Sequence, residues 1–333
     1  MARVAIITGA TGQDGSYLVD FLLEKEYNVY CIIRRTTYPV QSSNLTELSL
    51  KNKNLTLFDA DITDFTSVLK VFEESEKFDM IEVYNLAAQS DVAVSFRCPV
   101  LTVQTNIIGT LNLLESIRHC GLVHKVKFYQ ASTSEMFGKV QEVPQNEKTT
   151  FYPRSPYGVS KLAAHWMVLN YREAYGLFAC CGILFNHESP RRGLNFVTQK
   201  IIKSLKSPEQ NVVIGNLEAK RDWGHAHDYV RAMWMMLQQD EPDDFVVSSG
   251  EQHSVRDFIE KACEKIGIII TWSGTGIDEI GKDQNGKVIV RVSSEFYRPC
   301  EVETLLGDCT KLKNKLGWSP VYSFDDLIDD MIK

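Results

Sequence analysis

A tyrosine and a lysine four positions apart are the first residues of the sequence that could do chemistry together. Tyr157 and Lys161 lie in a segment with helical spacing of its apolar residues, so both side chains leave the same helical face. A nearby ammonium group favours phenolate, and we therefore expect Lys161 to lower the pKa of Tyr157. Such a tyrosine can act as a base toward a sugar or alcohol hydroxyl. The same spacing also arises by chance, and the pair would then be a surface pair.

Two further polar residues precede this pair in the chain. Thr133 and Glu135 follow a β-rich segment, and ligands of open α/β sheets bind beyond the carboxyl ends of the strands. We expect Thr133 to hydrogen-bond the reacting hydroxyl beside Tyr157. Glu135 would add a second acid/base group, which a simple dehydrogenase does not need. Considered alone, Glu135 would be interpreted as a solvated loop residue.

A glycine-rich loop lies between the first predicted strand and the first predicted helix. Its glycines, Gly9, Gly12 and Gly15, have the spacing G-x-x-G-x-x-G. They would permit a tight turn, close approach of a pyrophosphate and close packing of helix on strand. Free N–H groups and the positive end of the helix would face the phosphates. The context favours a dinucleotide site over a purely structural turn.

The second predicted strand indicates which dinucleotide is bound. An NAD site usually has Asp or Glu about 20 residues after the glycine loop. Here the strand is followed by Arg34 and Arg35, whose forked guanidinium groups suit a 2′-phosphate. We therefore expect NADP, the alternative being a solvated basic pair. Asp61 and Ile62, after the third strand, are expected to flank the adenine.

The elements that must position these residues alternate along the first half of the chain. We expect strands at residues 4–8, 29–33, 55–58, 81–86, 126–131 and 178–184, and helices at 16–25, 67–74, 101–118 and 156–175. Such alternation predicts right-handed βαβ units and an α/β fold with a Rossmann-type, doubly wound parallel sheet.

The pattern changes after residue 185, where Gly and Pro become more frequent. We expect helices at 228–237 and 255–266 and an exposed loop at 274–287. The resulting interpretation is a domain of residues 1–185 that binds the dinucleotide and carries the catalytic residues. Residues 186–333 would form a smaller α/β cap for substrate, with the chain crossing between the two.

Composition narrows the class of protein. The 333 residues are 44% hydrophobic and 24% charged, with a net charge of −7, which is typical of a globular protein and not of a nucleic-acid binder. The eight cysteines form no C-x-x-C pair and are expected to be reduced thiols. There is no signal-peptide pattern and no run of 18 apolar residues, so we expect a cytoplasmic protein without membrane contact.

Taken together, the motifs resemble the extended short-chain dehydrogenase/reductases that act on nucleotide sugars, and within them the GDP-mannose 4,6-dehydratase family. The resemblance runs from residue 9 to about residue 308 and rests on six segments, residues 9–15, 86–90, 132–138, 185–193, 221–226 and 298–303. The pair Ser134 and Glu135 discriminates, because glucose-type dehydratases carry Asp-Glu there and epimerases of this branch lack the Glu.

The resemblance implies an internal oxidation and reduction cycle on GDP-mannose with tightly bound, recycled NADP. Tyr157, aided by Lys161 and Thr133, would take the proton of the 4-hydroxyl while hydride leaves C4. Glu135 would remove the C5 proton and protonate the departing C6 hydroxyl, and hydride would return to C6. The product would be GDP-4-keto-6-deoxymannose, which makes the protein a carbon–oxygen lyase.

The resemblance also implies a set of binding residues. The expected cofactor-binding residues are Gly9, Thr11, Gly12, Gln13, Asp14, Gly15, Arg34, Arg35, Asp61, Ile62, Leu86, Ala87, Gln89, Ser90, Tyr157, Lys161, His187 and Arg192. The expected substrate-binding residues are Ser90, Thr133, Glu135, Tyr157, Asn186, Val197, Lys200, Arg221, Arg298 and Glu301. The segment 34–43 resembles the family's subunit-pairing loop, which implies a homodimer or homotetramer.

Departures from the family pattern and competing functions remain open. Leu101 stands where the family usually has Tyr, and His227 where Lys is common. His225 and His227 lack a third ligand at a suitable spacing, so we expect no metal site. An NADPH-dependent reductase of a GDP-4-keto-6-deoxy sugar is the second alternative, either alone or as a second activity of the same protein. It would also use Tyr157 and Lys161, but it would not need Glu135. A non-catalytic dinucleotide-binding protein is the third alternative.

Overall fold

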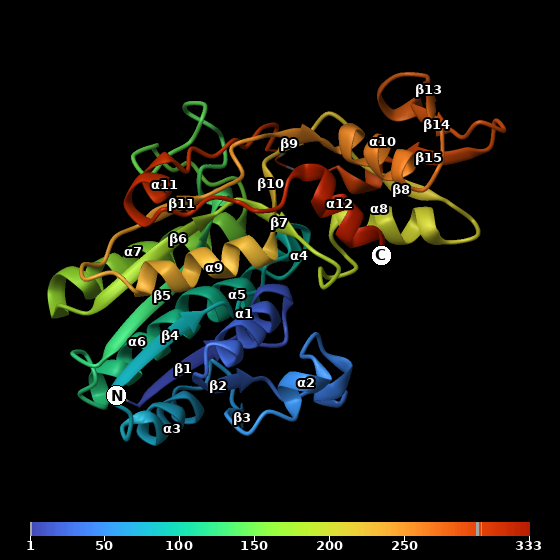
Figure 1. Cartoon of the computed structure of the whole chain (residues 1–333). Helices are drawn as coiled ribbons and strands as arrows, with labels where there is room; N and C mark the ends of the chain where they lie inside the picture. The colour runs from blue at the N-terminus through green and yellow to red at the C-terminus, as the bar shows by residue number, and fades with distance from the viewer. Residues whose placement is uncertain (1, 298–299, 301) are drawn as a thin grey trace.

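The larger part of the molecule is a seven-stranded parallel sheet with helices on both faces (Figure 1). This computed structural model describes residues 2–297, 300 and 302–333. In spatial order the strands are β11 (Phe245–Val247), β6 (Phe178–Leu184), β5 (Val126–Thr133), β4 (Met80–Asn85), β1 (Arg3–Thr8), β2 (Asn28–Ile33) and β3 (Leu55–Asp59). The order reverses beside β1, and the predicted doubly wound Rossmann-type sheet is confirmed.

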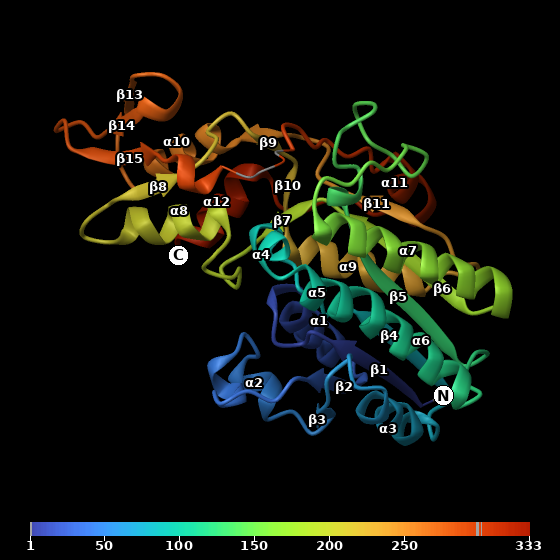
Figure 2. The same ribbon diagram turned by 180° about the vertical axis from the view of Figure 1, so that it is seen from behind.

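Alternating side chains of the strands build the two faces of this sheet. In β1, Ala5 and Ile7 belong to one core and Val4 and Ile6 to the other, because successive side chains of a strand point to opposite faces. The first face is covered by α1 (Gln13–Glu24), α9 (Ala226–Leu237) and α11 (Thr310–Leu316). The second is covered by α3 (Phe65–Ser75), α6 (Gly109–His119) and α7 (Pro156–Tyr175), seen in Figure 2.

Three short helices complete the first half of the chain. They are α2 (Glu47–Leu50), α4 (Val92–Arg97) and α5 (Pro99–Val103). A π-helical turn, Gln104–Ile108, joins α5 to α6, so the helix expected at 101–118 is interrupted. Within the residues described, no helix combines the length and apolarity that a membrane span would need.

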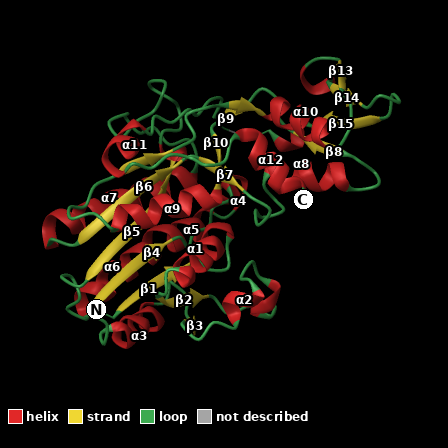
Figure 3. Cartoon of the chain, viewed as in Figure 1, coloured by secondary structure: helices red, strands yellow, loops and turns green. Residues whose placement is uncertain are grey.

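The second part of the molecule is a group of helices and short strands beside the main sheet (Figure 3). It has its own hydrophobic core. Helices α8 (Val197–Lys206), α10 (Val255–Lys265) and α12 (Phe324–Ile332) accompany a sheet of order β13 (Thr271–Ser273), β14 (Ile280–Lys282), β15 (Val288–Val292) and β8 (Val212–Ile214). Two strand pairs connect it to the main sheet: β7 (Asn186–Glu188) with β10 (Trp223–His225), and β9 (Lys220–Arg221) with β12 (His253–Ser254). The expected loop at 274–287 is wrong in part, because it contains β14, which pairs with β13 and β15.

The buried carboxylate of Asp222 ties the two parts together. It lies between β9 and β10 and accepts hydrogen bonds from the backbone N–H groups of Ser249, Gly250 and Gly307 and from the Ser249 hydroxyl. Ser249 and Gly250 follow β11 of the main sheet, so one side chain holds both parts of the fold. Burial raises the pKa of Asp222 to about 6, against the effect of these donors.

We predict that Asp222→Ala destabilises the protein strongly. Four hydrogen bonds to the buried carboxylate would be lost and the buried N–H group of Gly307 left without its acceptor, at a cost of about 3 kcal/mol in the free energy of unfolding. Urea denaturation followed by circular dichroism measures the change. Asp278→Ala is the matched control, because Asp278 is exposed on a turn of the second part. Equal denaturation midpoints for the two variants would contradict the role given to Asp222.

Candidate active site

A cleft of about 1560 Å³ lies between the carboxyl edge of the main sheet and the second part of the molecule. All four residues predicted to be catalytic line it. So do the predicted cofactor-binding residues Gly9, Thr11, Gly12, Gln13, Asp14, Gly15, Arg34, Asp61, Ile62, Leu86, Ala87, Gln89, Ser90, His187 and Arg192. The predicted substrate-binding residues Asn186, Val197, Lys200 and Arg221 line the same cleft. Arg298 and Glu301 fall outside the described residues.

The glycine loop is packed too tightly for larger residues. A Cβ atom on Gly15 would lie 2.2 Å from the carbonyl oxygen of Gly9, so α1 begins directly against the turn. Gly9 has a φ of +68°, a conformation that favours glycine, and a Cβ there would lie 2.9 Å from the backbone nitrogen of Ala87. The N-cap of α1, Gly12, contributes no capping side chain. The first N–H groups of α1 therefore face the cleft without a cap from their own N-cap residue.

The loop that follows β4 is held beside the glycine loop by side chains from two elements. The Thr8 hydroxyl accepts hydrogen bonds from the backbone N–H groups of Leu86 and Ala87, each at 3.0 Å. Asn106, in the π-helical turn, bonds both the N–H and the carbonyl oxygen of Gln89. Its amide also donates to the Ser160 hydroxyl on α7 at 2.9 Å. One buried asparagine thus fixes this loop relative to the helix that carries Tyr157 and Lys161.

The start of α7 brings Tyr157 next to Glu135. Ser155 caps the helix by accepting a hydrogen bond from the N–H of Gly158. Pro156 occupies the first turn, where the N–H group that proline lacks would have no partner within the helix. A Cβ on Gly158 would lie 2.7 Å from the carbonyl oxygen of Glu135. Only a residue without a side chain lets α7 pack so closely on the 3₁₀ turn at 134–136. Glu135 also donates its backbone N–H to the Thr133 hydroxyl at 3.2 Å.

Burial dominates the proton affinities of the tyrosine and the lysine. It raises the pKa of Tyr157 to about 12, against the effects of a hydrogen bond with Thr133 and the charge of Arg192. The predicted lowering of this pKa by Lys161 is therefore wrong. Burial likewise lowers the pKa of Lys161 to about 8, and its ammonium group donates to the carbonyl oxygen of Ala131 at 2.9 Å. Lys161 keeps its charge below about pH 8.

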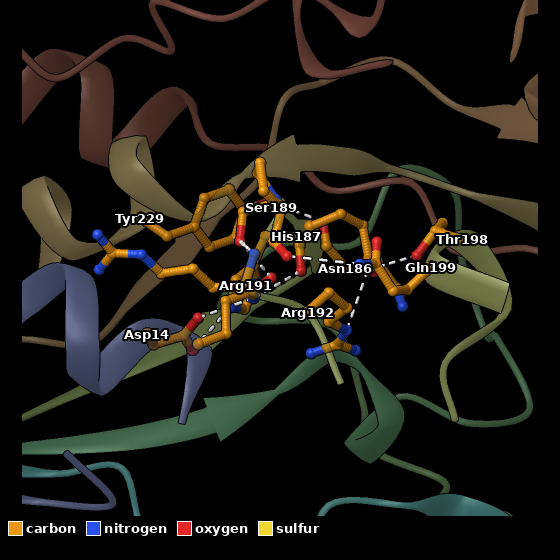
Figure 4. A network of polar contacts seen from close by, with 12 residues as sticks. Asp14, Asn186, His187, Ser189, Arg191, Arg192, Thr198, Gln199 and Tyr229 are labelled. Carbon is orange, nitrogen blue, oxygen red and sulfur yellow. Dashed lines mark hydrogen bonds and ion pairs between the residues drawn. The ribbon is translucent and has the colours of Figure 1, made fainter. Parts of the chain in front are cut away.

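A polar network joins the glycine loop to the segment after β6 (Figure 4). Nε2 of His187 lies 2.8 Å from Oδ2 of Asp14, and Nδ1 lies 2.7 Å from the carbonyl oxygen of Phe185. Gln13 donates to the carbonyl oxygen of His187 and accepts from the Ser189 hydroxyl. The network ties the beginning of α1 to β7, at the boundary between the two parts of the molecule.

The two arginines after β2 lie in different surroundings. Arg34 lines the cleft together with Ile33 and Thr36. Arg35 is not among the residues lining this cleft, and its exposed guanidinium lies 4.0 Å from the carboxylate of Asp59, which is also exposed. An exposed pair at this distance contributes little energy. The geometry therefore distinguishes between two neighbours that the sequence treats as equivalent.

The far end of the cleft is formed by the second part of the molecule. Nζ of Lys200, on α8, lies 3.4 Å from the ring centroid of Phe296. Arg221 lies on β9 and is 7% exposed, with one guanidinium nitrogen donating to the carbonyl oxygen of Lys220. Cationic groups and an aromatic ring suit a phosphorylated, base-carrying ligand. Among the residues that the structure describes, no group of three His, Cys, Asp or Glu side chains is arranged to hold a metal ion.

Sequence reasoning missed several residues that shape this cleft. Asn106 resembles any polar residue in a helical pattern, and only its π-helical turn marks it. Glu188 is 2% exposed and pairs with Arg192 at 3.0 Å, while the Thr198 hydroxyl donates to the same carboxylate. Phe296 is separated by almost a hundred residues from Lys200, so no local pattern links the two. Of these residues, only Glu188 has a local sequence signal, because an acidic residue shortly before Arg191 and Arg192 can form an ion pair with one of them.

Comparisons with a family model and with known proteins give matches to the same family over nearly the whole chain. A family model described as GDP-mannose 4,6 dehydratase matches residues 6–331. A human protein named GDP-mannose 4,6 dehydratase is 53% identical, with 99% of this chain and 90% of the human protein covered. A Vibrio cholerae protein named GDP-mannose 4,6-dehydratase is 49% identical, with 100% of this chain and 93% of that protein covered.

Solved structures show the same architecture at lower identity. UDP-glucose 4-epimerase from Thermotoga maritima, solved with UDP-glucose, has a TM-score of 0.81 at 26% identity, covering 99% of this chain and 97% of the epimerase. dTDP-glucose 4,6-dehydratase from Bacillus anthracis, solved with NAD, has a TM-score of 0.80 at 21% identity, covering 99% and 96%. The second likeness shows the fold alone. The family match over residues 6–331, with relatives of 53% and 49% identity, shows that this chain belongs to the GDP-mannose 4,6-dehydratase family.

Proposed function

We propose that the protein is a lyase that converts GDP-mannose to GDP-4-keto-6-deoxymannose and water, with NADP as a retained cofactor. The observation that carries this proposal is the placement of Glu135 against the start of α7, in the same cleft as Tyr157, Lys161 and the glycine loop. The names of the family's relatives supply the substrate. A carboxylate beside the dehydrogenase residues favours dehydration over a simple ketone reduction.

The residues of the cleft fit a nicotinamide dinucleotide. The close-packed glycine loop lines the cleft at the start of α1, where backbone N–H groups would bind a diphosphate. Asp61 and Ile62 line the same cleft and are proposed to flank the adenine. Arg34, which lines the cleft, is the cation placed for a 2′-phosphate. When bound, the dinucleotide supplies a hydride acceptor for C4 and a hydride donor for C6 of the sugar.

Tyr157 is the proposed base for the sugar 4-hydroxyl, with Thr133 orienting the same group. A buried phenol is a weak acid, so its phenolate is a strong base that needs positive charge nearby to form. Lys161 remains largely protonated at pH 7 because its pKa is about 8. The hydrogen bond with Thr133 and the charge of Arg192 both lower the pKa of Tyr157 against the effect of burial.

Glu135 is the proposed acid and base for the loss of water. Its carboxylate would take the C5 proton, which the 4-ketone makes acidic, and give that proton to the departing C6 hydroxyl. Once C6 has been reduced, C5 would need one proton to complete the product. Tyr157 would hold one proton, taken from the 4-hydroxyl, and this proton would be available for C5. Atoms and charge then balance, and the sugar has lost one water.

Incubation of purified protein with GDP-mannose, followed by mass spectrometry, tests the proposed function. Loss of one water without added cofactor is the expected result. A further gain of two hydrogens when NADPH is supplied would mean that the protein also reduces the 4-keto product, which is the reductase activity as a second step. An unchanged substrate with and without NADPH would reject GDP-mannose as the substrate.

Assembly of the protein into a homodimer or homotetramer stays a prediction.

Glu135→Gln is expected to abolish water loss while dinucleotide binding persists. The amide keeps the size of the side chain but cannot carry the proton, and the loss of a general acid/base group costs about 10²–10⁴-fold in rate. Mass spectrometry follows the product, and fluorescence titration follows NADP. Glu173→Gln, at an exposed position on α7, is the control and should be fully active. Full activity of Glu135→Gln would contradict the proposed acid/base role of this carboxylate.

Tyr157→Phe is expected to lower the turnover number by about 10²–10⁴-fold, because the proposed base for the 4-hydroxyl is removed. Single-turnover measurement of dinucleotide reduction on adding GDP-mannose reports this step directly. Tyr152→Phe serves as control, since Tyr152 is 52% exposed and lies outside the cleft lining. Near-normal reduction in Tyr157→Phe would rule out the base assignment.

Arg34→Ala is expected to weaken NADP binding by about tenfold or more and NAD binding far less, because a charge-assisted bond to a phosphate is worth about 1.5–3 kcal/mol. Arg35→Ala, with its side chain directed at Asp59, should have the smaller effect. Titration of both variants with both dinucleotides measures the ratio. Equal losses for NADP and NAD in Arg34→Ala would contradict a 2′-phosphate contact.

A further inference from the structure

The Asp14–His187 pair has a geometry that defines the charge of the imidazole. Nε2 faces the carboxylate of Asp14 at 2.8 Å, and Nδ1 faces the backbone carbonyl of Phe185 at 2.7 Å. The ring stacks on Tyr229, with centroids 4.2 Å apart and planes 25° apart (Figure 4). A carbonyl oxygen and an ionised carboxylate accept hydrogen bonds and do not donate them. Both ring nitrogens must therefore carry hydrogen, and His187 is an imidazolium ion.

The proton affinities of the two groups agree with this geometry. Burial opposes the ionisation of Asp14, but the charge of His187 and hydrogen bonds from His187 and Gln13 lower the pKa of this carboxyl below its usual value. Asp14 in turn raises the pKa of His187, although burial and the charge of Arg192 oppose the change. Both ring nitrogens of His187 are engaged within the chain, so a direct hydrogen bond to the cofactor is not the role that this geometry favours.

The position of Asp14 explains why its charge needs a partner. It is the second residue of α1, and Gly12 before it provides no side-chain cap. In the proposed function this helix end faces the dinucleotide diphosphate. A free carboxylate there would compete for the helix N–H groups, since Asp near a helix start readily accepts from them, and it would repel the diphosphate.

We propose that His187 is a positioning residue: its fixed positive charge draws Asp14 away from the end of α1, keeps that end open to a diphosphate and ties the glycine loop to β7. The proposal rests on the proposed dinucleotide site and deepens it. His187 would act through Asp14, without contacting the reacting atoms. Cofactor affinity would then depend on a residue from the far side of the cleft.

Four forms of the full-length protein test this proposal, namely wild type, His187→Phe, Asp14→Asn and the double variant. Phenylalanine keeps a ring to stack on Tyr229 but removes both N–H groups. We expect His187→Phe to raise the NADP dissociation constant by about tenfold, the scale of one charge at a helix start. Adding Asp14→Asn should restore most of the affinity, because the carboxylate that His187→Phe leaves with only the neutral Gln13 amide is then replaced by an uncharged group.

The double variant separates a charge effect from damage to the fold. If the affinity of the double variant is no better than that of His187→Phe, the proposal is overturned, because a merely structural role predicts no rescue. His187→Gln provides a second test, since it keeps a donor for Asp14 without the charge and should also bind NADP weakly. Wild-type affinity in His187→Gln would show that the charge is not needed, which also overturns the proposal.

A matched control is available elsewhere in the chain. His225 pairs with Asp330 at 3.1 Å, and neither residue lines the cleft. His225→Phe removes a buried histidine–aspartate contact in which Nδ1 accepts from the N–H of His227, and it should leave the NADP dissociation constant unchanged. Failure of the wild-type protein to bind any dinucleotide would contradict the proposed function itself. That outcome is distinct from wild-type binding with no effect of His187→Phe.

Discussion

Two helices that start in direct contact with loop backbone are the constraint on which the site depends. α1 can begin beside Gly9 only because residue 15 has no Cβ, and α7 can begin beside Glu135 only because residue 158 has none. Close-packed backbone leaves no room for adjustment. The first contact presents helix N–H groups to the cleft, and the second places a tyrosine and a carboxylate at one end of the sheet. Binding and chemistry thus share one packing solution.

Charge at the cleft is organised in two pairs, one that joins distant parts of the chain and one within a single segment. Asp14 pairs with His187, and the buried Glu188 pairs with Arg192. In these two pairs each buried charge meets an opposite one, which offsets the cost of burying it. Because Asp14 comes from α1 and His187 from the segment after β6, the first pair holds these two elements together across the cleft. Their electrostatic and mechanical roles cannot be separated by deleting single residues.

Local signals predicted the elements with strong periodicity. The helix over 156–175 and the strand over 178–184 were bounded correctly, because Ser155 and Pro156 mark a helix start and Gly176 a helix end. β14 was assigned to a loop because its strand character depends on partners on both sides in space. In the site, the residue types at 133, 135, 157 and 161 were sufficient to expect one cleft. The pKa of Tyr157 could not be predicted from the sequence, because it depends on burial, and burial depends on packing that no local pattern contains.

The different surroundings of Arg34 and Arg35 show what limits such reasoning. In an extended segment, neighbouring side chains point in opposite directions, so a pair of like residues after a strand divides between cleft and solvent. The residue type predicts a phosphate contact, but the direction decides which arginine can make it. The same holds for His187, whose type suggests a cofactor ligand while its two hydrogen bonds engage it within the chain. Residue type therefore predicts the chemistry of a site, and tertiary geometry determines which atoms perform it.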